Sequence, residues 1–214
     1  MVSSNLTRVR RHPERGNYER ETLLDILRSG LVCQVAFQIN GQPFIIPMSY
    51  YNNEEFIYIH SSTAARITRI LREGTSVAIS VLELNGLVIA KGLADNSMNY
   101  RSAVIFGKPT EIVSDGEKIS YFKEWIDNLM PGRKANTELP TEDELKGVAA
   151  FKIRLDQFSV KVREGGPSET RKNPDIWSGV IPISSLFSDP IFASSGDFPE
   201  HIMSFIESRN SPRG

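Results

Sequence analysis

The sequence predicts a mainly β fold, an antiparallel barrel or sandwich into which helices are inserted. Two observations support this fold class. Six or more short segments with strand-like alternation follow one another along the chain, and tight-turn signals join most of them. The 214 residues, of which 40% are hydrophobic, are enough to build one packed core.

The first expected elements are a helix and a strand. An apolar stripe over residues 18–28 predicts the helix, with Asn17 as its N-cap and Ser29-Gly30 as its end. Residues 31–39 then alternate between apolar and polar side chains, which is typical of a half-buried strand. The cysteine of this run, Cys33, is expected to be a buried structural thiol.

Asn40-Gly41 is a strong hairpin signal, so residues 42–51 should form the return strand. This strand contains Pro43 and Pro47. Because proline has no amide donor, we expect an edge or an irregular stretch there, which would leave backbone groups available to a ligand.

A third strand is expected over residues 56–60. Residues 61–63 should cap a short helix that ends near Glu73-Gly74. A fourth strand over 77–81 is followed by Asn85-Gly86, which predicts a second hairpin with a return strand over 87–93.

The later elements come from weaker patterns. They are strands over 100–106, 149–155 and 158–162, an amphipathic helix over 117–130, a short helix capped by Thr141 and Glu144, and a possible helix over 199–207. We expect an N-terminal arm at 1–16, one domain over 17–183 and a C-terminal extension over 184–214.

Composition excludes several classes of function. The formal net charge is −1, so we expect no nucleic-acid partner, and no apolar run approaches a membrane span, so we expect no membrane association. A single cysteine rules out an internal disulfide and favours a cytoplasmic protein. No grouping of His, Cys, Asp and Glu has metal-ligand spacing, so no metal site is expected.

The candidate phosphate site comprises His60, Ser61, Ser62, Arg66 and Arg69. A phosphate dianion needs hydrogen-bond donors and positive charge together, and serine hydroxyls, helix N-terminal amides and a guanidinium supply both. The alternative is a capped surface helix with solvated arginines. The strand-end histidine, His60, could contact a ligand or move a proton, or be satisfied by backbone alone.

A second polar cluster, residues 97–102, lies at the start of a strand. Alternation should place Asn99 and Arg101 on one face and Tyr100 and Ser102 on the other. Such a density of donors suits a ligand edge or an oligomer contact, although an ordinary polar strand entry would look the same.

Three further side chains, Lys161, Arg163 and Trp177, could flank a planar ligand, because Arg and Trp both stack on flat rings. Trp177 could equally be a core or interface residue. The chain lacks Gly-x-Ser-x-Gly, Gly-x-Gly-x-x-Gly and phosphate-loop motifs.

Taken together, these stretches resemble the FMN-binding split-barrel superfamily, in its pyridoxamine 5'-phosphate oxidase-like branch close to nitroimidazole-resistance flavoproteins. The stretches that carry the resemblance follow in the expected order over roughly residues 11–183: 12–16, 31–35, 44–50, 58–62 with Arg66, 97–102, 160–163 and 177–182. A C-terminal Arg-Leu-x-Pro-type motif of true pyridoxamine-phosphate oxidases is absent, so that exact activity is not expected.

The resemblance implies a six-stranded antiparallel split β-barrel with peripheral α-helices, forming a homodimer with FMN at the subunit interface. The expected FMN-binding residues are Ile46, Pro47, Met48 and Ser49 along the isoalloxazine, His60, Ser61, Ser62 and Arg66 around the ribityl phosphate, Asn99, Tyr100, Arg101 and Ser102 on the interface strand, and Arg163 and Trp177 closing the site.

The resulting hypothesis is an FMN-dependent oxidoreductase that acts on a small organic substrate, with NADH or NADPH as a candidate reductant. His60 is the expected proton donor or substrate contact, and Arg101 or Arg163 should stabilise the N1–C2=O edge of the reduced flavin. The alternative is a non-catalytic flavin- or haem-binding carrier or sensor.

Overall fold

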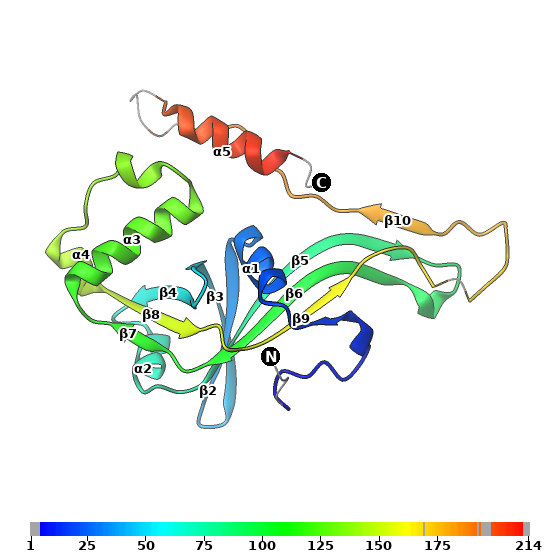
Figure 1. Ribbon diagram of the computed structural model, residues 1–214, viewed down its shortest axis with the longest axis horizontal. Coiled ribbons are helices and arrows are strands. Elements are labelled where there is room, and N and C mark those ends of the chain that lie inside the picture. The colour runs from blue at the N-terminus through cyan, green and yellow to red at the C-terminus, as the bar shows by residue number, and fades with distance from the viewer. Residues whose placement is uncertain (1–4, 169, 192, 194–197, 212–214) are drawn as a thin grey trace.

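The computed structural model describes residues 5–168, 170–191, 193 and 198–211 (Figure 1). These residues form one antiparallel sheet in the order β1-β9-β6-β5-β2-β3-β4-β8-β7, with β10 paired to the outer part of β5. The strands are β1 (Gly16–Asn17), β2 (Val32–Ile39), β3 (Gln42–Asn52), β4 (Phe56–Ser62), β5 (Val77–Ile89), β6 (Ser97–Gly107), β7 (Thr110–Ile112), β8 (Val148–Arg154), β9 (Gln157–Arg163) and β10 (Gly179–Pro182).

The helices lie around this curled sheet (Figure 1). They are α1 (Arg20–Ser29), α2 (Arg66–Arg72), α3 (Asp115–Leu129), α4 (Glu142–Gly147) and α5 (Glu200–Asn210), with short 3-10 turns η1 (Pro13–Arg15), η2 (Leu93–Asp95) and η3 (Arg133–Asn136). The mainly β, antiparallel split-barrel prediction is confirmed. The described residues contain ten strands rather than six, in part because the short edge strands β1, β7 and β10 add to the sheet. None of the described helices is long and apolar enough to cross a membrane.

The first predicted hairpin is confirmed. Asn40 and Gly41 have φ values of 49° and 81°, and β2 pairs with β3 from Val32 opposite Ser49 to Ile39 opposite Gln42. Both turn residues have positive φ, which Asn and Gly tolerate better than other residues, so the dipeptide determines this turn.

The second predicted hairpin, at Asn85-Gly86, is wrong. One continuous strand, β5, passes through this point with a bulge, and the chain reverses only beyond Ile89. A Cβ at Gly86 would lie 3.1 Å from the carbonyl oxygen of Ile181, because β10 packs alongside. Glycine is therefore needed here for close strand approach, and the β5–β6 arm extends far from the barrel (Figure 1).

Two hydrophobic cores lie on opposite faces of the sheet. The larger core packs α1 and α2 against the inner faces of β2 to β6, β8 and β9, and Phe151 is its largest fully buried side chain. The smaller core packs α3 against the outer faces of β3, β4, β7 and β8, through Tyr51, Ile112, Tyr121 and Ala150. Strands β4 and β8 are thus covered on both faces.

Capping predictions had mixed outcomes. Thr141 and Glu144 form the predicted capping box of α4. The predicted cap of α2 by residues 61–63 is wrong, because Ala65 is the N-cap and no side chain caps it. In the C-terminal part, Arg209 of α5 donates to the carbonyl oxygens of Arg28 and Ser29, which docks α5 against the end of α1.

Candidate functional site

The sheet opens between β3 and β4. Strand β3 pairs with β2 over Gln42–Ser49 but with β4 only over Tyr50–Asn52, while β4 continues to Ser62 along β8. Tyr50 lies opposite Ile59, so continuing that register would place Ser49 opposite His60. We call this opening the split. Its two free backbone edges carry the predicted residues 46–49 and 60–62.

Side chains of β3 alternate across the sheet at the split. Met48 is buried in the larger core and Ile46 packs against it. Pro47 is exposed and Ser49 half-buried, and by alternation both point to the other face. The four predicted residues therefore share one strand edge, and only two of them share each face.

Arg66, at the start of α2, stands beside the split. Its guanidinium lies 5.3 Å from the centre of the Phe44 ring of β3, so it approaches β3 from the β4 side of the opening. Within the part of the chain that the structure describes, no carboxylate pairs with Arg66. It is an exposed cation available to an anionic ligand.

Arg69 behaves differently from Arg66. It is exposed and lies 3.9 Å from Glu73 in an i,i+4 ion pair. This pair gives Arg69 a carboxylate partner on the solvent side of α2. The structure therefore distinguishes Arg69 from Arg66, which the sequence alone did not.

The two serines organise the turn between β4 and α2. Ser61 Oγ lies 2.7 Å from Thr68 Oγ1, and Thr68 Oγ1 donates to the Ser62 carbonyl oxygen at 2.6 Å. Ser62 Oγ accepts from the Ala64 amide at 3.3 Å. Both hydroxyls therefore support the turn that presents Arg66, and α2 is too short to offer a helix N-terminal anion site.

His60 lies on the other face of β4 from Ser61, packed under α3. Its Nδ1 is 2.6 Å from the Tyr121 hydroxyl, and the rings of Phe122 and Trp125 meet it edge-on, with Trp125 at 5.1 Å between ring centres. Burial lowers the pKa of His60, so the neutral imidazole is favoured. A neutral histidine is a poor proton donor near pH 7 but a good hydrogen-bond partner or metal ligand.

The lowered His60 pKa predicts a pH dependence of stability. Between the unfolded-state pKa near 6.5 and the lower folded-state pKa, the unfolded chain binds a proton that the folded chain does not. The free energy of unfolding should therefore fall as pH falls through this window, by at most about 1.4 kcal/mol per pH unit for one proton. His60→Gln, which keeps a partner for Tyr121, should flatten the slope measured by urea unfolding from pH 7 to 5. Parallel slopes for the two proteins would contradict this origin.

The second polar cluster centres on Arg163, at the end of β9. This side chain is 8% exposed, and it donates to Asn99 Oδ1 and to the carbonyl oxygens of Gly165 (3.4 Å) and Gly166 (3.2 Å). All three acceptors are neutral, and Nε has no partner among the described residues. A buried guanidinium without a carboxylate is unusual, because buried charges are normally paired.

Arg101 is already neutralised. It is paired with Asp25 of α1 and lies 3.5 Å from Glu83 of β5, on the side of the sheet that α1 covers. Its neighbour Tyr100 lies opposite Leu84 and Arg163, while Ser102 donates to the Lys161 carbonyl oxygen at 3.3 Å. Within the predicted 97–102 cluster, Arg101 is therefore held by carboxylates, Ser102 bonds the backbone of β9, and Asn99 accepts from Arg163.

Trp177 lies outside both clusters. It is exposed and packs over Gly179, where a Cβ would meet its ring at 2.9 Å. Gly179 pairs with Ile89 near the tip of the arm. Trp177 is therefore not in the core, and within one chain it lies far along the sheet from the split.

The predicted residues do not close around one cavity in a single chain. Neither of two surface cavities, of about 530 and 560 Å³, is lined by any of them. The split holds 46–49, 60–62 and Arg66, and the arm holds Asn99 to Ser102, Arg163 and Trp177. Among the described residues, no group of three or more His, Cys, Asp or Glu could hold a metal ion.

Sequence reasoning missed the surroundings of His60. The amphipathic pattern of α3 was recognised, including Phe122 and Trp125, but nothing local indicates that α3 packs on β4. Tyr121, which binds His60, is 61 residues away in the sequence. The backbone carbonyls of Gly165 and Gly166 around Arg163 carry no sequence signal either.

Comparisons with known proteins agree with this architecture. The profile of a family described as pyridoxamine 5'-phosphate oxidase matches residues 19–162. The FAD and haem binding protein from Mycobacterium smegmatis is 29% identical, with 90% of this chain and 97% of that chain covered and a TM-score of 0.82. The flavocytochrome Anf3 from Azotobacter vinelandii is 28% identical, with 94% and 97% covered and a TM-score of 0.85.

A more distant structure shares the fold alone. A 5-nitroimidazole antibiotic resistance protein from Bacteroides thetaiotaomicron is 21% identical, with 69% of this chain and 86% of that chain covered and a TM-score of 0.58. No curated protein matches the sequence. The family profile covers well over half of the chain, including β2 to β8 and the split. The resemblance found in the sequence is thereby confirmed, and the chain belongs to the pyridoxamine 5'-phosphate oxidase family.

Proposed function

We propose that this protein is a homodimeric flavoprotein that binds the FMN portion of a flavin in the split and uses it for redox chemistry on a small organic substrate. The observation that carries the proposal is the split itself. Two unpaired strand edges flank an opening, and Arg66 lies beside it with no carboxylate partner among the described residues. A phosphate needs such a cation, and a flavin ring can use the free edge groups.

The donor set fits a flavin phosphate. Arg66 would bind the phosphate, while Ser61 and Ser62 hold the turn that positions it. The backbone of 46–49, unpaired toward β4, would receive the edge of the ring system. Bound flavin would supply the hydride and electron transfer, and the protein would supply position and charge.

Of the two arginines proposed for the pyrimidine edge of the flavin, Arg163 is the better candidate. Arg101 is neutralised by Asp25 and Glu83, whereas the partners of the buried Arg163 among the described residues are all neutral oxygens. An anionic partner would complete its environment. Because Arg163 lies in the arm and Arg66 at the split, we propose that they act on one flavin from two subunits.

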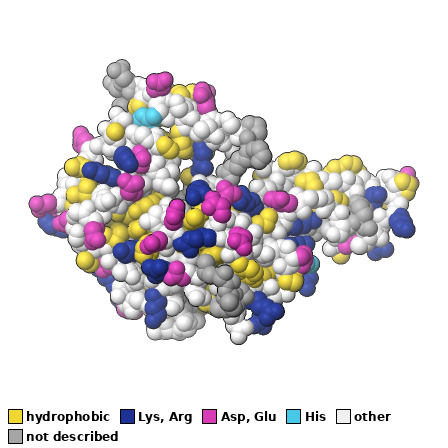
Figure 2. All heavy atoms as spheres, viewed as in Figure 1, with side chains coloured by type: hydrophobic (Ala, Val, Ile, Leu, Met, Phe, Trp, Pro, Cys, Tyr) yellow, Lys and Arg dark blue, Asp and Glu magenta, His cyan; other side chains and the backbone are white. Residues whose placement is uncertain are grey.

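A second copy of the chain is also favoured by exposed apolar side chains. Hydrophobic side chains are visible along the arm in Figure 2. The relevant ones on β2, β5 and β6, which we call the apolar face, are Val32, Leu82, Leu84, Leu87 and Met98, each at least 39% exposed. Such a patch is typical of a protein interface.

Leu82→Arg should therefore disrupt the dimer. Leu82 is 63% exposed, so the arginine costs the folded monomer little, but it would place an unpaired charge in the interface. Sedimentation equilibrium should show a dimer for the wild type and at least a tenfold weaker association for the variant. Val113→Arg, at an exposed site away from the arm, is the control. A wild-type monomer, or an undisturbed dimer in Leu82→Arg, would contradict this interface.

The direct test of the proposed function is an absorption spectrum of the purified protein, followed by addition of flavin and then NADPH under anaerobic conditions. Flavin bands that bleach with NADPH support a reductase, and chromatography of the released cofactor distinguishes FMN from FAD. A protein that stays colourless and does not bind added flavin would overturn the proposal.

The second candidate function is haem binding. Two structures that are 28–29% identical over at least 90% of this chain are described as containing haem as well as flavin or as a flavocytochrome. His60 fits a ligand role, because it is neutral and Tyr121 holds its Nδ1, and Nε2 has no partner among the described residues. A Soret band that is lost in His60→Ala would support haem at this histidine.

A further inference from the structure

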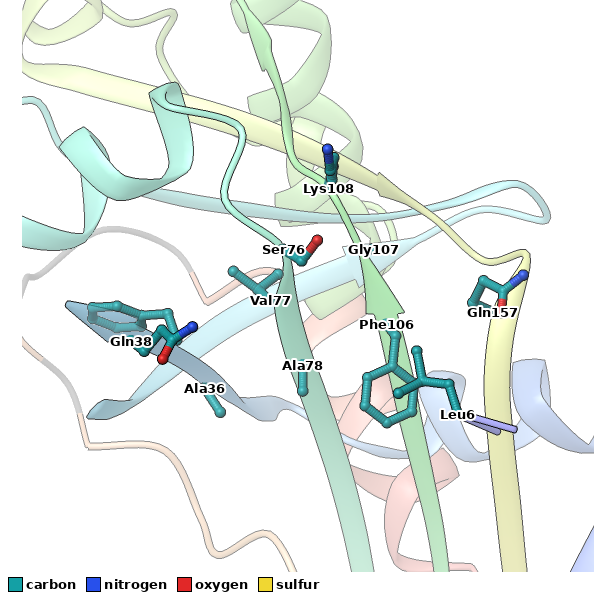
Figure 3. A pocket seen from close by; sticks show the side chains of 11 residues that line it. Leu6, Ala36, Gln38, Ser76, Val77, Ala78, Phe106, Gly107, Lys108 and Gln157 are labelled. Atoms are coloured by element: carbon teal, nitrogen blue, oxygen red, sulfur yellow. The ribbon is translucent and has the colours of Figure 1, made fainter. Parts of the chain in front are cut away.

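A cavity of about 530 Å³ lies on the face of the sheet opposite the larger core, at the ends of β2, β5 and β6. Ala36 of β2 pairs with Ala78 of β5, and Ala78 pairs with Phe106 of β6. Figure 3 shows the two alanines between Gln38 and the Phe106 ring, with Leu6 beside that ring. The short alanine side chains leave a hollow, and Phe106 and Leu6 give it apolar walls.

The rim of this cavity is polar and carries one sign of charge. Gln38, Ser76 and Gln157 contribute amide and hydroxyl groups. Lys108 is the only charged residue among those that line the cavity, and the described residues provide it with no ion pair. An exposed ammonium beside an apolar hollow favours a ligand that combines a ring with a negative charge.

The other cavity differs in this respect. The 560 Å³ cavity between α3 and α4 is lined by Lys123 and Lys134 but also by Glu138 and Glu144. Its charges are balanced, so it offers an anion no net attraction. Of these two cavities, the Lys108 cavity is the one whose lining carries a single sign of charge.

We propose that the Lys108 cavity binds a small planar aromatic anion. The ring would lie on Ala36 and Ala78 against Phe106, and the anionic group would meet Lys108 at the rim. The cavity shares no residue with the split or with the apolar face.

The test compares two probes of equal shape, 2-naphthoate and neutral 2-naphthamide, by isothermal titration calorimetry on the purified full-length protein. The wild type should bind 2-naphthoate more tightly. Lys108→Gln should reduce the affinity for 2-naphthoate by about fivefold to tenfold, the range of one exposed charge-assisted contact. It should leave the affinity for 2-naphthamide unchanged. Ala78→Leu fills the hollow and should weaken both probes by more than tenfold.

Lys123→Gln is the matched control, because Lys123 is an exposed lysine lining the other cavity. It should change neither affinity, and 2-naphthoate should release no bound flavin, which fluorescence would detect. No binding by the wild type, or equal 2-naphthoate affinity in Lys108→Gln, would overturn the proposal. Weaker binding of 2-naphthoate by Lys123→Gln, or release of flavin, would mean that the probe binds at another site, and would also overturn the proposal. Because Lys108 is exposed, its variant keeps the test valid even if Ala78→Leu fails to fold.

Discussion

Replacing Arg66 with alanine should reduce the affinity for FMN by about 10- to 100-fold, because charge-assisted hydrogen bonds to a phosphate contribute about 1.5–3 kcal/mol. Arg66 is exposed and its guanidinium lies over the Phe44 ring, so its loss should leave the fold intact. The affinity can be measured by quenching of flavin fluorescence as apoprotein is titrated into FMN.

Two comparisons make this prediction specific to the phosphate. Arg69→Ala removes an equally cationic side chain from the same helix, but one paired with Glu73, and should change FMN affinity by less than about twofold. Riboflavin, which lacks the phosphate, should bind Arg66→Ala and wild type alike. If the substitution reduced the affinity for riboflavin as much as the affinity for FMN, Arg66 would be acting on the ring or on the fold rather than on the phosphate.

The elements that sequence predicted well are those determined by neighbouring residues. Asn40-Gly41 formed its hairpin because both residues accept positive φ, and Thr141 with Glu144 formed a capping box within one helical turn. Asn85-Gly86 carries the same local signal but forms a bulge. There, pairing with β10, almost a hundred residues later, outweighs the turn preference.

The candidate site shows the same limit. Resemblance placed residues 46–49, 60–62 and Arg66 together, and the β3–β4 register does bring their strands to one opening. The partners that decide what each side chain can do are distant in sequence. Asp25, which neutralises Arg101, is 76 residues away, and Tyr121, which holds His60, is 61 residues away. The periodicity of a sequence does not predict contacts between residues so far apart. The structure was therefore needed to choose between Arg101 and Arg163 as the candidate for the pyrimidine edge of the flavin.

The largest effect on stability is expected at Phe151, in the centre of the larger core. Its side chain is fully inaccessible, and β8 is paired with β4 on one side and β7 on the other. Because both neighbouring strands and the helices that cover them restrain this position, the core cannot collapse into the space that Phe151→Ala would leave. The expected loss is about 3–5 kcal/mol of the free energy of unfolding, and about 2–4 °C in Tm per kcal/mol for a chain of this size.

Calorimetry should therefore show a Tm lowered by roughly 10 °C for Phe151→Ala. Phe151→Leu keeps most of the buried volume and should lose less than half as much. Leu93→Ala, at a side chain that is 97% exposed, should stay within about 0.5 kcal/mol of the wild type. Since Phe151 lies opposite Ile59 on β4, one residue before His60, a folded Phe151→Ala protein should also bind flavin more weakly. A large loss of stability with unchanged flavin affinity would show that the β4 side of the split does not depend on this core.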